Sequence, residues 1–279
     1  MAKFKLEFFR DLEGLPSPPF QILKVLDEVA KASLEDFNIV RIVQNDPAIA
    51  CRILKTANAP LYGYSSKILS LQQAGGLLGP APVKNIALTS PVLERFGIHH
   101  AKYQLDCMRL WRHISATAMI AGGLGMLIPN MQGDLCYTAG LIHDIGKIAL
   151  MVHFPEVMSE SIKLAVQNHM PLTQAETERI ALSHADIGAA MAENWRFPDV
   201  LIKAIKNFPC ENALETGDKL AGVVCLAEYL ANDWGFHDGV DRNPNSLPGE
   251  LLDLLGIGDK DLEQWEPALK QNAEFSAEE

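Results

Sequence analysis

The residues of this 279-residue chain that could do chemistry centre on an adjacent histidine and aspartate, His143 and Asp144, in the stretch Ala139-Gly-Leu-Ile-His-Asp-Ile-Gly-Lys-Ile-Ala-Leu150. An imidazole beside a carboxylate is a good nucleus for a metal site, and Lys147 is well placed for a phosphate. The pair is a weak signal by itself, because a metal site needs three or more converging groups. It could equally be a hydrogen-bonded pair that braces a helix turn at Gly146.

Further candidate ligands occur in three other apolar segments. They are His113 in Leu110-Trp-Arg-His113, His184 in Leu182-Ser-His-Ala-Asp186, and Glu228 in Cys225-Leu-Ala-Glu-Tyr229. A buried carboxylate needs a partner, and a cation is the best one available. Imidazole and carboxylate ligands together suit a divalent ion of Fe, Mn, Ni, Zn or Mg, with little discrimination among these metals. We expect no organic cofactor.

Each of these candidates also has an interpretation without a metal. His113 could be a core histidine satisfied by hydrogen bonds, and Glu228 could lie on a solvated face. For His184, which starts a capped helix, we expect a hydrogen bond to a neighbouring helix or a place on the rim of the site rather than direct ligation. For Lys147, we expect a solvated side chain beyond the glycine unless the chain is an enzyme.

Helices must position these residues, because apolar side chains recur at helical spacing and no stretch alternates like a strand. Capping signals mark several helix starts. They are Ser33 with Asp36, Asp46-Pro47, Ser70 with Gln73, Thr173 with Glu176, and Ser183 with Asp186. The expected helices span residues 22–29, 33–43, 47–58, 70–79, 106–127, 135–143, 183–195, 199–207 and 218–231. We expect a loop over 232–250 and a frayed C-terminal end. The predicted fold class is all-α.

The charge and cysteine content exclude some classes of protein. The formal net charge is −11 and no run of Lys and Arg occurs, so general nucleic-acid binding is not expected. The five cysteines are scattered and odd in number, which argues against a disulfide framework or a cysteine zinc site and fits a reducing cytoplasm. The N-terminus lacks the apolar core of a signal peptide. The uncharged stretch 114–133 is expected to form a buried helix and a turn rather than a membrane span.

The candidate site residues belong to a longer series of ordered stretches. In chain order these are Leu15-Pro16, Asn45-Asp-Pro-Ala48, Leu54-Lys-Thr-Ala-Asn58, Gln73-Ala74 with Leu77-Leu-Gly79, Asn85-Ile-Ala-Leu88, Leu110-Trp-Arg-His113, Ala139 to Lys147, His184-Ala-Asp-Ile-Gly188 and Trp195-Arg-Phe-Pro198. The series, over about residues 15–207, resembles the HDOD domain, the HD-related output domain of bacterial signalling proteins. Within it, the stretch around His143-Asp144 resembles the His-Asp signature of the HD metal-dependent phosphohydrolases.

The resemblance implies an all-helical fold with an HD-like core and an N-terminal helical lobe. Gly97 and the pair His99-His100 interrupt the helices near 96–102, so we divide the chain into an N-terminal lobe at 1–100 and an HD-like lobe at 101–279. Because no flexible linker occurs there, we expect the lobes to be packed together. The resemblance also implies a bacterial, cytoplasmic signalling module that is generally non-catalytic. The chain has no room for a further partner domain, so we expect a stand-alone member.

Carried over position by position, the resemblance implies a four-ligand metal site. Its ligands would be His113, His143, Asp144 and Glu228. Glu228 stands where the family has a late aspartate, and the longer glutamate can still ligate. After Ile205, where many relatives have a His-His pair, this chain has Lys206-Asn207-Phe208, which removes nitrogen donors for a second metal. The Gly-Tyr-Pro element of cyclic-dinucleotide phosphodiesterases is also absent.

Two functions from different classes remain open. The first is a regulatory module that binds a protein partner or a small signalling ligand and keeps a metal site. The alternative is a metal-dependent phosphohydrolase acting on a phosphoester or nucleotide. In that enzyme Asp144 would hold the metal and orient a water molecule, and Lys147 would offset developing negative charge. We favour the binding module, without general nucleic-acid binding or membrane association.

Overall fold

Helices make up the described part of the chain, and no β-strand occurs in it. The computed structural model describes residues 6–10, 12, 46–59, 66–79, 82–83, 86, 107–240 and 247–278. Its helices are α1 (Leu6–Arg10), α4 (Pro47–Ala57), α5 (Leu71–Leu78), α7 (Cys107–Leu127), α8 (Gly133–Ile142), α9 (Ile145–His153), α10 (Pro155–Asn168), α11 (Leu172–Ile180), α12 (His184–Asn194), α13 (Asp199–Asn207), α14 (Cys210–Thr216), α15 (Lys219–Asp233), α16 (Gly249–Leu255) and α17 (Asp259–Glu278). The all-α prediction is therefore confirmed. The helices expected at 22–29 and 33–43 and the boundary near 96–102 lie outside the described residues.

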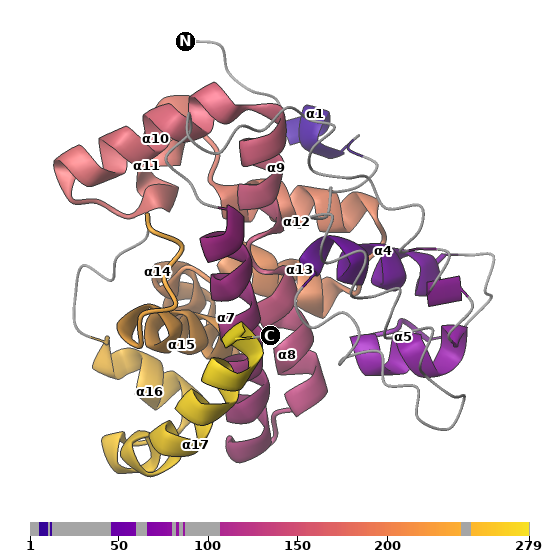
Figure 1. Cartoon of the computed structure of the whole chain (residues 1–279), viewed down its shortest axis with the longest axis vertical. Helices are drawn as coiled ribbons and strands as arrows, with labels where there is room; N and C mark the ends of the chain where they lie inside the picture. The colour runs from indigo at the N-terminus through magenta and orange to yellow at the C-terminus, as the bar shows by residue number, and fades with distance from the viewer. Residues whose placement is uncertain are drawn as a thin grey trace.

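The pair α7 and α8 organises the other helices (Figure 1). The two helices lie side by side through the middle of the molecule, with α15, α16 and α17 on one side and α4 and α5 on the other. Helices α9, α10 and α11 lie at one end of the pair. Helix α17 packs directly on α7, where a Cβ atom added to Gly123 would overlap the side chain of Leu269. This close contact places the C-terminal helix on the core.

Small residues let α7 and α8 approach closely. A Cβ atom added to Gly140 would lie 2.9 Å from the Cα atom of Ala118 and 3.1 Å from the carbonyl oxygen of Thr117. Only glycine fits at this separation without a backbone shift. The contact fixes α7, which carries His113, against α8, which ends just before His143.

The expected capping signals are found at the starts of α4 and α12. The Asp46 carboxylate accepts a 2.9 Å hydrogen bond from the backbone N–H of Ile49, and Pro47 begins the helix. At α12, Ser183 and Asp186 form a complete capping box. These side chains satisfy backbone N–H groups that the first helical turn leaves without a partner. Both helix starts are therefore encoded locally.

The capping role expected for Thr173 and Glu176 is wrong. Helix α11 begins at Leu172, with Pro171 at the N-cap position and no side-chain cap. Glu176 is instead fully buried, and its carboxylate accepts hydrogen bonds from His184. Glu176 therefore binds a buried histidine inside the molecule and does not cap its own helix.

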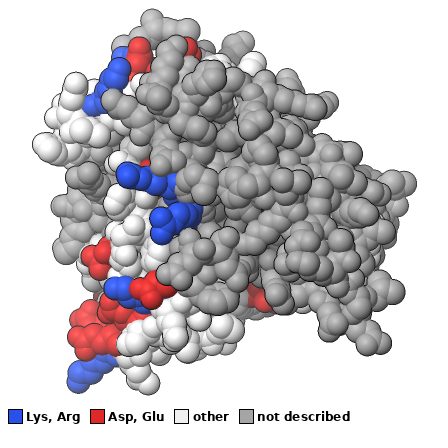
Figure 2. Space-filling view, in the orientation of Figure 1, with Lys and Arg blue, Asp and Glu red and all other residues white. Residues whose placement is uncertain are grey.

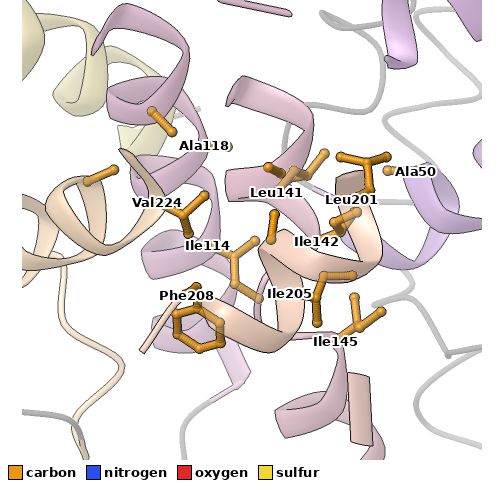
Figure 3. Close-up of a cluster of buried hydrophobic side chains, with 14 of the residues drawn as sticks. Ala50, Ile114, Ala118, Leu141, Ile142, Ile145, Leu201, Ile205, Phe208 and Val224 are labelled. Carbon is orange, nitrogen blue, oxygen red and sulfur yellow. The ribbon is translucent and has the colours of Figure 1, made fainter. Parts of the chain in front are cut away.

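The core lies where α7, α8, α13 and α15 meet (Figure 3). Ile114 of α7, Leu141 of α8 and Val224 of α15 are fully or almost fully buried. Ile205 and Phe208, from α13 and its C-terminal cap, point into the same cluster. Burial of this much apolar surface is the main source of stability available to the fold. The candidate site residues sit on the same helices and are held by the same packing.

The C-terminal region is more helical than the sequence indicated. Helices α16 and α17 were not identified from the sequence, and α17 continues to Glu278. Fraying of the C-terminal end stays a prediction. The loop expected over 232–250 is found for the non-helical residues 234–240. Figure 2 shows acidic side chains gathered over the first turns of α17, where Asp259, Asp261 and Glu263 are exposed. This patch carries part of the net negative charge.

Within the described residues, one apolar segment has the length and composition of a membrane span. It is Gly133–His153, which comprises α8 and α9, and 94% of its most apolar window is buried inside the structure. A core helix passes the same test, and the candidate site lies in the middle of this segment. The stretch 114–133 forms most of α7 followed by a turn and is largely buried, as expected.

Two of the cysteines are paired, although their number and spacing argued against a disulfide framework. Cys210, at the start of α14, and Cys225 of α15 form a disulfide with their Cα atoms 5.6 Å apart. That separation lies in the usual range for a disulfide. Cys51 and Cys136 are free and buried.

Segments from the N-terminal part of the chain contact the C-terminal part. The backbone N–H of Leu71 donates to the Thr138 hydroxyl over 3.2 Å, and the Lys67 ammonium donates to the carbonyl oxygen of Arg196 over 3.1 Å. The first of these contacts is buried. The division of the chain at residue 100 stays a prediction.

Trp195 offers a test of this packing. The indole is 2% exposed, its N–H donates to the carbonyl oxygen of Leu12 over 3.0 Å, and the Lys55 ammonium lies 5.7 Å from the ring centroid. We predict that Trp195→Ala lowers the free energy of unfolding by about 3–5 kcal/mol, as large-to-small core changes do. Trp195→Phe, which keeps an aromatic ring, should cost less. Urea unfolding checks both values, and an unchanged midpoint for the alanine variant would contradict a core role.

Candidate metal centre

Three candidate ligands from different helices come together in the structure. His113 of α7, His143 at the end of α8 and Glu228 of α15 each offer one ligand atom, and these atoms all lie within 4.8 Å of one another. Both histidines are fully buried, whereas Glu228 is partly exposed. Two imidazoles and a carboxylate at this spacing can hold a divalent ion.

Hydrogen bonds orient both imidazoles for ligation. The Nδ1 atom of His113 lies 2.9 Å from the carbonyl oxygen of Phe236, and the Nδ1 atom of His143 lies 2.7 Å from the carbonyl oxygen of Gly140. A carbonyl only accepts, so each Nδ1 carries a proton and donates. The Nε2 atoms of both rings are buried and have no hydrogen-bond partner among the described residues. This arrangement is typical of metal-ligating histidines, which are fixed by the nitrogen that does not bind the metal.

The pKa values of the two histidines move in opposite directions. Burial lowers the pKa of His113, because a charged ring loses its hydration. Burial also acts to lower the pKa of His143, but the neighbouring carboxylates of Asp144 and Glu228 outweigh it and the pKa is raised. A metal ion would therefore meet one neutral ring and one ring for which it competes with a proton.

Asp144 lies beside the three ligands and is shared by several groups. Its Oδ2 atom is 3.4 Å from the Nε2 atom of His143, 3.9 Å from that of His113 and 2.9 Å from the Lys147 ammonium. Its Oδ1 atom is 3.5 Å from the Nε2 atom of His184. Burial raises the pKa of this carboxyl, but the histidines and Lys147 more than offset burial and hold it well below its usual range. Asp144 is therefore an ionised carboxylate in a fully buried position.

The expectation of a solvated Lys147 is wrong. Its side chain has no exposure, and its ammonium lies 2.9 Å from the Oδ2 atom of Asp144 and 2.9 Å from the Oδ2 atom of Asp238. Asp238 follows α15, is 1% exposed, and accepts a 2.8 Å hydrogen bond from the backbone N–H of Val240 through its other oxygen. The sequence interpretation missed Asp238, since it stands in a segment rich in loop-forming residues. In that segment, the only sequence feature that could have indicated a role in the centre is that residue 238 is an aspartate.

A second buried pair holds His184 beside Asp144. The Oε2 atom of Glu176 accepts hydrogen bonds from the Nδ1 atom of His184 over 2.8 Å and from its backbone N–H over 2.7 Å. Burial acts to lower the pKa of His184, but the Glu176 carboxylate outweighs it and raises the pKa to about 9. At neutral pH His184 is an imidazolium that faces Asp144. The hydrogen bond to a neighbouring helix is the contact expected for this residue.

Phe208 closes the side of the centre where many relatives are expected to have histidines. Its ring centroid lies 5.0 Å from that of His143 and 5.7 Å from that of His184, and the residue is 2% exposed. Figure 3 shows the ring pointing into the core beside Ile114. An aromatic ring here packs against both imidazoles and offers no ligand atom.

The donor set suits a divalent ion. Two imidazoles and the Glu228 carboxylate come from three different helices, and the buried, ionised carboxylate of Asp144 lies beside them. Nitrogen and oxygen donors of these types are those that divalent ions take in proteins. The residues present therefore fit a metal ion.

Comparisons with known proteins agree with this fold and centre. The family model of the HDOD domain matches residues 15–208, so the chain belongs to the HDOD domain family. The match includes His113, His143, Asp144, Lys147 and His184. Glu228 and Asp238 follow it in the chain and complete the cluster from outside the matched stretch.

Relatives share the fold at low sequence identity. A protein of Treponema pallidum of unknown function is 24% identical over 88% of this chain and 47% of its own length, so the chain spans about half of that relative. The crystal structure of the response regulator MmoQ from Methylococcus capsulatus is 23% identical, with a TM-score of 0.68 over 90% of this chain and 97% of that one. A candidate phosphohydrolase of Shewanella amazonensis is 22% identical, with a TM-score of 0.53 over 97% and 96% of the two chains. These likenesses show the fold alone.

Gly146 is predicted to be essential for the approach of α9 to α12. A Cβ atom added there would overlap the carbonyl oxygen of His184 and lie 2.7 Å from the backbone nitrogen of Gly188. We expect Gly146→Ala to lower the free energy of unfolding by about 1–3 kcal/mol or more, because backbone rather than a side chain must move. Gly76→Ala is the matched control, since Gly76 is a helical glycine with nothing within 4 Å of an added Cβ. That change should be neutral or stabilising in urea unfolding.

The His184–Glu176 pair predicts a pH dependence of stability. The folded pKa of His184, about 9, lies above its ordinary value of 6.5, so the stabilisation is complete below pH 6.5 and is lost as the pH rises towards 9. Glu176→Gln removes the charge that raises the pKa. We expect this variant to be destabilised by a few kcal/mol at about pH 6 and by much less at about pH 9.5. Urea unfolding in the presence of a chelator checks this, and an equal loss at both pH values would contradict it.

Proposed function

We propose that this chain is a regulatory HDOD module that holds one divalent metal ion at His113, His143, Asp144 and Glu228 and acts by binding rather than by catalysis. The observation that carries the metal site is the pair of buried Nε2 atoms. Each stands on a ring fixed through Nδ1, and both lie within 4.8 Å of a Glu228 oxygen. A cation bound by both nitrogens would satisfy them, although at His143 it competes with the proton that the Asp144 and Glu228 carboxylates favour.

The enclosure of the centre supports a binding role. His113, His143, Asp144 and Lys147 have no exposed surface, and the Phe208 ring packs beside His143. A phosphoester and an attacking water need room next to the metal ligands. The Lys147 ammonium is also held by carboxylates, so it is not free to meet a phosphate. The partner would be a protein or a small signalling ligand, and the response-regulator name of the Methylococcus capsulatus relative supports a signalling context.

A metal-dependent phosphohydrolase is the second candidate. The partial exposure of Glu228 favours it, since this is the side from which a substrate could approach the ligands. A divalent ion here would supply Lewis-acid activation of water. Asp144 would orient that water, and Lys147 would have to leave its carboxylate partners to offset charge on the phosphate. A cytoplasmic location remains part of the proposal for either function.

Metal content tests the proposal directly. Full-length protein purified without chelator should contain about one divalent ion per chain, and His143→Ala should lose it because a ligand nitrogen is gone. His169→Asn is the matched control, since His169 is exposed and has a positive φ of 52° that asparagine tolerates. Elemental analysis after supply of Fe, Mn, Ni, Zn or Mg measures both variants. Retained metal in His143→Ala, or none in the wild type, would contradict the site.

A screen of phosphoesters and nucleotides with the same metals separates the two functions. We expect no turnover above the His143→Ala background. Turnover that depends on His143 would replace the binding role by the hydrolase.

A further inference from the structure

Lys147 is a charged side chain in a position with no access to water. It stands one helical turn after Asp144 on α9, and its ammonium lies 2.9 Å from Oδ2 of Asp144 and 2.9 Å from Oδ2 of Asp238. A buried ammonium is tolerated only when carboxylates replace its hydration. Lys147 is therefore a fixed cation inside the candidate centre, and it competes for the same negative charge that a metal ion would use.

The oxygen that Lys147 holds on Asp144 is the one that faces the metal ligands. The same Oδ2 atom lies 3.4 Å from the Nε2 atom of His143 and 3.9 Å from that of His113. An ammonium and a divalent ion that contact the same carboxylate oxygen are two positive charges a few ångströms apart. In a buried site they repel each other strongly. We propose that Lys147 sets the metal affinity of this centre, acting as an internal cation that competes with the metal for Asp144. The inference rests on the metal site proposed above and adds what controls its occupancy.

Asp238 is the second carboxylate that holds the Lys147 ammonium. The other oxygen of Asp238 is fixed by the backbone N–H of Val240, so the carboxylate is held in place to share the ammonium. Asp238 follows the same helix, α15, that carries Glu228. When a metal takes the Asp144 oxygen, Lys147 keeps a buried carboxylate partner in Asp238. Asp238 therefore favours the metal-bound state, whereas Lys147 disfavours it.

This arrangement fits a centre that responds to metal supply. A fixed ammonium that lowers the affinity raises the metal concentration at which the centre is half filled. Filling it changes the partner of Lys147 from two carboxylates to Asp238. A regulatory module can use such a change in occupancy as its signal.

Opposite effects of two substitutions test the proposal. Lys147→Met keeps the length and apolar stem of the side chain and removes the charge, so Mn²⁺ and Zn²⁺ should bind roughly tenfold more tightly or better. Asp238→Asn leaves the ammonium more dependent on Asp144, so the same ions should bind several-fold more weakly. In the double variant Lys147→Met/Asp238→Asn, the Asp238 substitution should no longer weaken binding. Competition with a chromophoric chelator on the full chain measures all four dissociation constants, and thermal unfolding with and without metal confirms that each variant folds.

The outcomes separate this inference from the metal site itself. Tighter binding by Lys147→Met together with weaker binding by Asp238→Asn supports it. If the wild type binds metal and Lys147→Met binds it with equal or lower affinity, the inference is overturned and the metal site stands. Binding by neither the wild type nor Lys147→Met overturns the metal site. Binding by Lys147→Met but not by the wild type supports the competition and overturns metal occupancy of the natural chain. If Lys147→Met alone fails to fold, the double variant compared with Asp238→Asn decides the sign.

Discussion

The Asp144 carboxylate is ionised and has no solvent exposure. Its burial is stable only if the surrounding helices place polar and positively charged groups around it. Lys147 and His184 supply positive charge to the Asp144 carboxylate. The Nε2 atoms of His143 and His113 face the same carboxylate. Burying this charge costs several kcal/mol unless all of these groups are in place. The positions of α7, α9 and α12 follow from this constraint as much as from apolar packing.

Close backbone contacts make the arrangement possible. Gly140 allows α8 to lie on α7, and Gly146 allows α9 to lie on α12, so that His113 and His184 reach the His143-Asp144 pair from different directions. The apolar residues of the same helices form the core shown in Figure 3. The same helix–helix contacts therefore stabilise the fold and hold the residues of the candidate centre in place. A change that opens the helices would lose the site before it exposed much of the core.

Several sides of the candidate centre are closed by packing and ion pairs. The Phe208 ring packs beside His143 and His184, and the Lys147 ammonium is held by two carboxylates. In the function that we propose, these features favour a module whose state depends on metal occupancy over one that turns over a phosphoester. The chain spans about half the length of the Treponema pallidum relative.

The sequence by itself determined the helical class, the helix starts at Asp46 and Ser183, and the identity of the site-forming stretches. These follow from short-range physics, since capping residues and apolar spacing act within one or two turns. The sequence also indicated His113, His143 and Glu228 as candidate ligands, because histidine and glutamate in apolar helices require an explanation. The structure brings one ligand atom of each within 4.8 Å of the others.

Only the tertiary structure decided how the charges are paired. Lys147 and Asp238 are 91 residues apart, and Glu176 turned from an expected helix cap into the partner of His184. The disulfide between Cys210 and Cys225 likewise depends on how α14 packs on α15. Local sequence shows which groups carry charge, but the free energy of a buried charge depends on which other groups the folded chain brings within a few ångströms of it.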